Sequence, residues 1–197
     1  MSRRARILLV DDRTENLIAL DAILSSLNQI LVPARSGEEA LKALLSDEFA
    51  VVLLDIVMPG MNGIETAARI KQNAKTRDVP IIFLTAAIAQ PEQPFLGYAA
   101  GAVDYLAKPF DPGVLKAKVS VLVDLYLKAS QLRDQAEVLS GRLEAVEEAV
   151  AALRQLPAVS QDAEARETTA RLAGRVGRLR DAFGGPESFW STTGSRT

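Results

Sequence analysis

The chain contains no cysteine and no histidine. Without cysteine, disulfide bonds and thiolate chemistry are excluded. Without histidine, the chain supplies no imidazole general base, no zinc site of the usual kind and no phosphohistidine of its own. No apolar run approaches the roughly 20 residues that a membrane-spanning helix needs. The apolar stretch after the basic N-terminus stops at Asp11, too early for a signal peptide. We therefore expect a cytoplasmic protein without membrane insertion.

The charge balance is also unremarkable in sign and size. The formal net charge is −2 and charged residues make up 24% of the chain, so strong non-specific binding to nucleic acid is not expected. Hydrophobic residues make up 48% of 197, which is an ordinary globular proportion. The length allows one domain of common size plus an appendage.

Short apolar runs alternate with amphipathic segments of helical length over residues 6 to about 120. Alternation of this kind predicts an α/β fold, a doubly wound five-stranded parallel sheet with five helices. Ser36 followed by Glu39 is a capping-box pattern that opens the second helix. The predicted strands are Ile7–Val10, Ile30–Val32, Val51–Leu54, Ile81–Leu84 and Val103–Leu106.

Carboxylates follow two of the predicted strands. Asp11 and Asp12 come after the first, and Asp55 comes after the third and just before a turn rich in proline and glycine. In a parallel sheet, ligands bind at the carboxyl ends of the strands, where these acids would meet. Because three carboxylates in one crevice repel one another, they imply a bound cation.

A heptad pattern begins after about Pro112 and continues to Pro157. Apolar residues recur every seven positions in two series, which predicts a long helix that leaves the domain and pairs with a second chain as a coiled coil. A single long helix packed on its own domain is the alternative. Parallel and antiparallel arrangements both remain open. The residues expected in the homodimer seam are Leu122, Leu125, Leu132, Leu139, Leu143, Val146, Val150 and Leu153.

The predicted domains are therefore three. Residues 1–121 form the α/β domain, and residues 122–156 form a coiled-coil helix continuous with its last helix. After a short break, residues 157–197 contain an amphipathic helix of about 163–183 and a flexible tail. Two glycines weaken this last helix, so it needs a partner, and folding back on the preceding helix would provide one.

The first domain resembles the receiver domain of two-component response regulators, over about residues 5–120. Five elements carry the resemblance, in the family's order and each at a strand end. They are Asp11-Asp12, Asp55, the turn Met58-Pro59-Gly60-Met61-Asn62-Gly63, Thr85, and Lys108-Pro109-Phe110. The resemblance implies a flavodoxin-like receiver fold and a signalling switch rather than an enzyme.

The resemblance also implies a phosphoacceptor. Asp55 would accept a phosphoryl group from a histidine kinase or a phosphotransfer protein. Mg²⁺ would be held by Asp12 and Asp55 directly, by Asp11 largely through water, and by the backbone carbonyl of Val57. Oxygen ligands with several retained waters suit this ion.

Four further residues have roles in the family pattern. Lys108 would pair first with Asp55 and then with a phosphoryl oxygen, and Pro109 would be in the cis form. Thr85 would bond to the phosphoryl group, and Tyr105 would move into the space that Thr85 leaves. The result would be a population shift between two packings.

Three alternatives remain open. The receiver could be the N-terminal part of a larger signalling enzyme, such as a hybrid sensor kinase or a cyclic-dinucleotide enzyme. An Mg²⁺-dependent aspartyl phosphatase is disfavoured because Val57 stands where such enzymes place a second Asp. A receiver-like scaffold without phosphate transfer is the third. No recognisable DNA-binding motif follows residue 120, so direct contact with nucleic acid is not expected.

Overall fold

A computed structural model describes residues 3–85 and 103–183 of the chain. The chain divides into two compact units, Met1–Ala129 and Ser130–Thr197, and the long helix α5 (Pro112–Gln155) contributes to both. The predicted fourth helix, between the fourth and fifth strands, lies outside the described residues, as does the predicted flexible tail.

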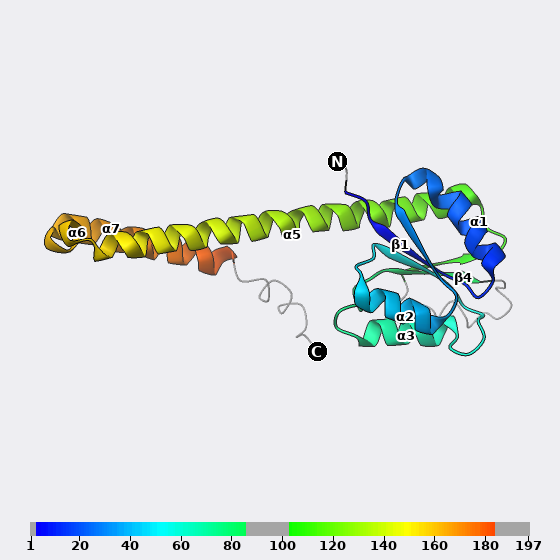
Figure 1. Cartoon of the computed structure of the whole chain (residues 1–197). Helices are drawn as coiled ribbons and strands as arrows, with labels where there is room; N and C mark the ends of the chain where they lie inside the picture. Colours follow the sequence, from blue (N-terminus) through cyan, green and yellow to red (C-terminus); the bar gives the residue numbers. More distant parts are fainter. Residues whose placement is uncertain (1–2, 86–102, 184–197) are drawn as a thin grey trace, which may run out of the picture. The chain divides into compact units, whose positions relative to one another are not determined.

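The first unit is built on a parallel sheet (Figure 1). Its strands lie in the order β2-β1-β3-β4-β5. This order places the first and third strands beside each other in the middle of the sheet, so the residues that end them are neighbours. The predicted α/β fold with a five-stranded parallel sheet is confirmed. The strands are β1 (Arg6–Val10), β2 (Ile30–Ala34), β3 (Val51–Asp55), β4 (Ile81–Thr85) and β5 (Asp104–Ala107).

Both faces of the sheet are covered, which explains the nearly continuous apolar strands. Successive residues of β1 point to opposite faces: Ile7 and Leu9 join one core cluster, and Leu8 and Val10 join the other. The first cluster includes residues of α1 and α5, and the second includes residues of α2 and α3. Helix α1 spans Thr14–Leu24 and is followed by a 3₁₀ turn at Ser25–Leu27. Helix α2 spans Gly37–Ser46, and helix α3 spans Gly63–Gln72.

Side chains cap the first turns of α2 and α3. Ser36 Oγ accepts a hydrogen bond from the Glu39 N–H at 3.2 Å, as a capping box requires. The Glu39 carboxylate reaches back one residue further than the usual box and accepts from the Arg35 N–H at 2.7 Å. At α3, Asn62 Oδ1 accepts from the Glu65 N–H at 2.9 Å. These caps fix where each helix begins beside the carboxyl edge of the sheet.

Gly63 lies where α3 begins, against the end of β3. Its N–H donates to the Ile56 carbonyl at 3.0 Å. A Cβ at this position would lie 2.1 Å from the Asp55 carbonyl oxygen and 2.8 Å from Ile56 Cα. Both are backbone atoms, so only glycine permits this close approach. Gly60, in the same turn, has a positive φ of 72°.

The second unit contains the end of α5, α6 (Pro157–Gln161) and α7 (Ala163–Phe183). The long helix ends just before Pro157, and the predicted break at residues 157–161 contains a short helix with Pro157 in its first turn, where a missing N–H costs nothing. Asp162 then caps α7 through its side chain. Among the described residues, no helix is both long enough and apolar enough to cross a membrane.

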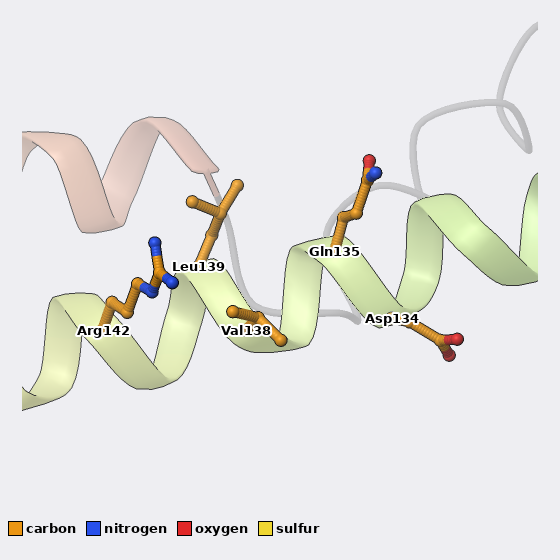
Figure 2. A pocket seen from close by; sticks show the side chains of 5 residues that line it. All are labelled: Asp134, Gln135, Val138, Leu139 and Arg142. Carbon is orange, nitrogen blue, oxygen red and sulfur yellow. The ribbon is translucent and has the colours of Figure 1, made fainter.

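Helix α7 runs back along α5 within the second unit. Arg180 forms an ion pair with Glu147 at 3.3 Å, and Val150 and Val176 are both buried. Leu139 and Arg142 project from α5 beside an open hollow of about 420 Å³ (Figure 2). The residues of the predicted seam therefore do not all lie in one interface: Val150 is covered within the chain, and Leu122 packs against the core of the first unit. The other large seam residues of the second unit are not covered in the same way.

Candidate functional site

Three carboxylates meet at the carboxyl edge of the sheet. Asp55 is the last residue of β3, and Asp11 and Asp12 follow β1 directly. One oxygen from each lies within 4.8 Å of the others. Asp11 and Asp55 are buried, and Asp12 is half-buried. The strand order brings these acids together because β1 and β3 are hydrogen-bonded neighbours.

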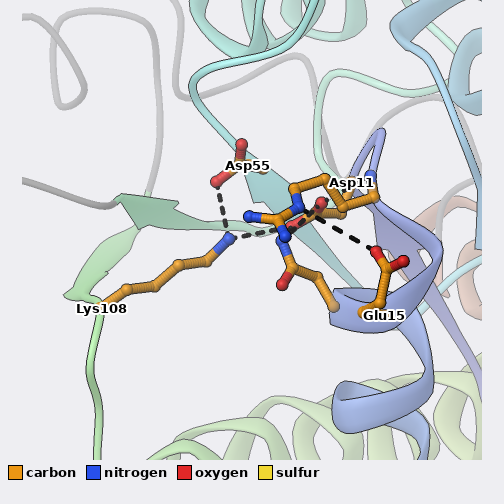
Figure 3. A network of polar contacts seen from close by, with 6 residues as sticks. Asp11, Glu15, Asp55 and Lys108 are labelled. Atoms are coloured by element: carbon orange, nitrogen blue, oxygen red, sulfur yellow. Dashed lines mark hydrogen bonds and ion pairs between the residues drawn. The ribbon is translucent and has the colours of Figure 1, made fainter.

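Lys108 reaches this cluster from the end of β5 (Figure 3). Its ammonium lies 2.9 Å from Asp55 Oδ1 and 2.9 Å from Asp11 Oδ2. The Lys108 N–H also donates to the Thr85 carbonyl, which holds the residue against the end of β4. One cation therefore neutralises part of the charge of two buried anions.

The pKa values of the pair reflect this arrangement. Burial raises the pKa of Asp55 above its ordinary value; Lys108 opposes the rise, and the charges of Asp11 and Asp12 add to it. Burial by itself would lower the pKa of Lys108, but its hydrogen bonds and ion pairs with Asp11 and Asp55 raise it instead. Lys108 is therefore held in its charged form, while the pocket keeps an excess of negative charge.

The oxygens of Asp11 are more fully engaged than those of Asp12. Asp11 accepts from the Arg13 N–H at 3.0 Å, from Asn16 Nδ2 at 2.8 and 2.9 Å, and from Lys108. Within the described part of the chain, the Asp12 carboxylate has no hydrogen-bond or ion-pair partner. Asp12, together with the second oxygen of Asp55, is accordingly the most accessible donor in the cluster.

The donor set fits a hard divalent cation. All three side chains offer oxygen, no nitrogen or sulfur ligand is present, and a single ammonium opposes three carboxylates. Mg²⁺ binds through one or two carboxylates and retains several waters, which suits a site with Asp12 and Asp55 open and Asp11 already hydrogen-bonded. The residues present therefore suit Mg²⁺.

The remaining predicted residues lie around the cluster. Thr85 is buried at the end of β4, beside Ala107 of β5. Val57 follows Asp55 by two residues, with a largely exposed side chain. The Lys108–Pro109 peptide bond is cis. Tyr105 packs against the core cluster on the α2–α3 side of the sheet. The roles predicted for these residues stay predictions.

Asn16 is a site residue that the sequence did not indicate. It lies in the first turn of α1 and donates from one amide nitrogen to both oxygens of Asp11. The only signal in the sequence that could have identified Asn16 is its position five residues after Asp11, in the first turn of the helix that follows the first predicted strand. By orienting Asp11, Asn16 fixes the carboxylate that Lys108 also contacts.

We predict that Asn16→Ala lowers the free energy of unfolding by about 2 kcal/mol, because Asp11 is buried and loses a hydrogen-bond donor to a charged group. Urea denaturation measures the change. Arg13→Ala is the matched control, since the backbone N–H of Arg13 contacts Asp11 and its side chain is exposed. Equal losses for the two variants would contradict the role of Asn16.

Comparison with known proteins gives one family. The response regulator receiver domain model matches residues 7–120. A Vibrio cholerae protein named "Probable cyclic di-GMP phosphodiesterase" is 38% identical over an alignment of 151 residues, which covers 73% of this chain and 34% of that protein. Response regulator PleD of Caulobacter vibrioides is 34% identical over 131 residues, covering 66% of this chain and 29% of PleD. The chain thus spans about a third of the length of these two relatives.

Solved structures agree with the fold. The chemotaxis protein CheY4 of Vibrio cholerae is similar with a TM-score of 0.57 and 29% identity, and the match covers 61% of this chain and 99% of CheY4. The part that matches is therefore about the size of a single receiver-like domain.

Proposed function

Because this chain belongs to the response regulator receiver domain family, which matches residues 7–120, we propose that it is a phosphorylation-controlled switch of a two-component system. The phosphoryl group comes from the phosphohistidine of a partner kinase or phosphotransfer protein, since the chain has no histidine. Asp55 is the acceptor.

Transfer occurs at the second oxygen of the Asp55 carboxylate, which Lys108 leaves open. This oxygen forms a bond to phosphorus while the bond from phosphorus to the partner's imidazole nitrogen breaks, and the imidazole takes up a proton as it leaves. Lys108 holds the other carboxylate oxygen and is near enough to turn to a phosphoryl oxygen afterwards. The product is an acyl phosphate on Asp55.

Like charges oppose this step, because both the carboxylate and the phosphoryl group are anionic. Mg²⁺, held by Asp12, Asp55 and the Val57 carbonyl, with Asp11 acting through water, would supply the charge neutralisation that the transfer needs. Asp11 keeps Lys108 and Asn16 in place beside it. The number and closeness of the three acids support this proposal.

The change is passed on by the neighbouring strands. Thr85 ends β4, and its backbone carbonyl accepts from the N–H of Lys108, the residue that follows β5. In this proposal the Thr85 hydroxyl bonds to the phosphoryl group on Asp55. Tyr105 lies two residues before Ala107, the β5 partner of Thr85, and adjusts to the new packing. The shift arises from contacts that exist only in the phosphorylated state.

The output side of the proposal is the helical extension. The receiver comprises residues 1–121, and residues 122–156 carry the change into a homodimeric helical output. The continuous course of α5 through Pro112–Gln155 supports this coupling.

One observation carries the proposal: Lys108 bridges two of three carboxylates that cluster at the carboxyl ends of β1 and β3. We expect incubation with acetyl phosphate and Mg²⁺ to add one phosphoryl mass to the protein. The mass shift should disappear in Asp55→Ala, while Asp47→Ala, which removes an exposed acid, should retain it. Equal phosphorylation of wild type and Asp55→Ala would contradict the assignment.

A second candidate is that this receiver controls a linked signalling enzyme. The name of one relative, "Probable cyclic di-GMP phosphodiesterase", favours this reading, and that protein is about three times as long as the matched part. The role of Asp55 is the same in both cases, so the phosphorylation experiment tests the step that they share.

A further inference from the structure

The second unit exposes large apolar side chains that have no cover within the described chain. Each is between 43% and 66% exposed. Four are spaced seven residues apart on α5, and two are spaced seven apart on α7. We call this set the exposed stripe; it consists of Leu132, Leu139, Val146 and Leu153 on α5 and Leu172 and Leu179 on α7.

The two halves of the exposed stripe face the same side of the hairpin. On α5, Val146 and Leu153 lie four residues before and three after the buried Val150. On α7, Leu172 and Leu179 lie four before and three after the buried Val176. The two helices run in opposite directions, with Glu147 beside Arg180. On each helix the exposed residues lie at the same angle about the helix axis from the buried valine. Because the helices are antiparallel, these equal angles place both sets of exposed residues on the same side of the helix pair. The six residues therefore form one apolar face.

The opposite side of α5 is acidic. Glu137, Glu144 and Glu148 are exposed and lie about half a turn from the exposed stripe. The stripe itself contains no charge and presents on the order of several hundred Å² of apolar surface, enough to mark an interaction site on a monomer. A partner for this face must be apolar and elongated, with the same heptad spacing.

We propose that the exposed stripe packs against the same face of a second copy of this chain, so that two α5–α7 hairpins form a four-helix bundle. The inference rests on the proposed dimeric output and specifies its surface. The four-helix bundle takes the place of the two-stranded coiled coil expected from the sequence, because Val150 of the expected seam is already covered within its own chain. The hollow lined by Val138, Leu139 and Arg142 lies on this part of α5 and would receive side chains of the partner copy (Figure 2).

Charge decides how the two hairpins face each other. Between residues 130 and 155, α5 carries five acidic and three basic side chains, whereas α7 carries five basic and three acidic ones. A two-fold axis parallel to the helices places each α5 beside the partner's α7, so that helices of opposite net charge adjoin, although Glu137, Glu144 and Glu148 lie on the outer side of α5. A perpendicular axis would place like-charged helices beside each other. The bundle therefore has the two α5 helices running in the same direction.

Light scattering of the full chain tests the surface. Wild type should be a dimer, and Leu139→Lys with Val146→Lys should shift it to monomer while far-ultraviolet circular dichroism stays unchanged. The matched control, Glu137→Lys with Glu144→Lys, adds the same two lysines to the opposite side of α5 and should remain dimeric. A monomeric wild type, or a dimeric Leu139→Lys/Val146→Lys variant, would overturn the proposal.

Single cysteines test the direction, and they need no background removal because the chain has none. With a short bis-maleimide, Leu132→Cys and Leu153→Cys should each cross-link to themselves, because a two-fold axis parallel to the helices sets equal positions of the two α5 helices at the same level, facing each other across the axis. Glu144→Cys should not cross-link. Cross-linking only in a mixture of Leu132→Cys with Leu153→Cys would overturn the parallel arrangement.

The same samples separate this inference from the proposed function. Phosphoryl transfer to Asp55 is read by mass, and it should persist in Leu139→Lys/Val146→Lys because its residues lie in the first unit. If neither wild type nor the variants accept a phosphoryl group, the result argues against the proposed function. If wild type accepts the phosphoryl group but is a monomer, the result argues against the bundle alone.

Discussion

Replacing Gly63 with alanine is expected to lower the free energy of unfolding by at least about 3 kcal/mol, because the new methyl group would meet backbone atoms that cannot rotate away. The Asp55 carbonyl oxygen would lie 2.1 Å from the added Cβ. Relief requires α3 to move away from the end of β3, which also shifts Asp55. Urea denaturation should show the loss, and acetyl phosphate labelling should slow with it.

Two other glycines serve as controls for this substitution. Gly60 has a φ of 72° but an open surrounding, so Gly60→Ala carries only backbone strain and should cost about 1 kcal/mol. Gly141 lies within α5 with nothing nearby, so Gly141→Ala should stabilise the helix by about 1 kcal/mol. If Gly63→Ala costs no more than Gly60→Ala, the close contact between β3 and α3 is not rigid.

The sheet could be predicted because each strand is a short apolar run buried on both faces. The runs Ile7–Val10 and Val51–Leu54 correspond to β1 and β3 with one residue added to each. The acid cluster followed from the same pattern, since parallel strands deliver the residues after their carboxyl ends to one edge. In both cases a local signal in the sequence fixed a feature of the tertiary structure.

Asn16 could not be predicted in this way. It lies on a helix, and its contact with Asp11 depends on the rotation of α1 relative to β1, which no periodic signal records. The division of the heptad residues was also hidden. Whether Val150 faces α7 or a second chain depends on how the chain turns at α6, where the sequence predicted only a break. Such features depend on how elements meet and not on the elements themselves.

Lys108→Met is expected to lower the free energy of unfolding of the metal-free protein by about 3 kcal/mol at neutral pH. Removing one partner of a buried ion pair leaves uncompensated charge, here on both Asp11 and Asp55. We take the lower end of the usual range because Lys108 is 24% exposed. Urea denaturation in EDTA measures the loss, and saturating Mg²⁺ should recover part of it.

Asp12→Asn in the same pocket should act in the opposite direction. It removes a like charge from the neighbourhood of Asp55 without breaking an ion pair, so the free energy of unfolding of the metal-free protein should rise by about 1 kcal/mol and respond less to Mg²⁺.

The pH dependence of stability provides an independent check on Lys108→Met. The pKa of Asp55 is already raised and should rise further without Lys108, so the stability lost in Lys108→Met should return as pH falls through the pKa of that carboxyl and the buried charge is neutralised. A deficit that stays constant with pH and Mg²⁺ would mean that Lys108 contributes through packing of its aliphatic chain and not through its charge.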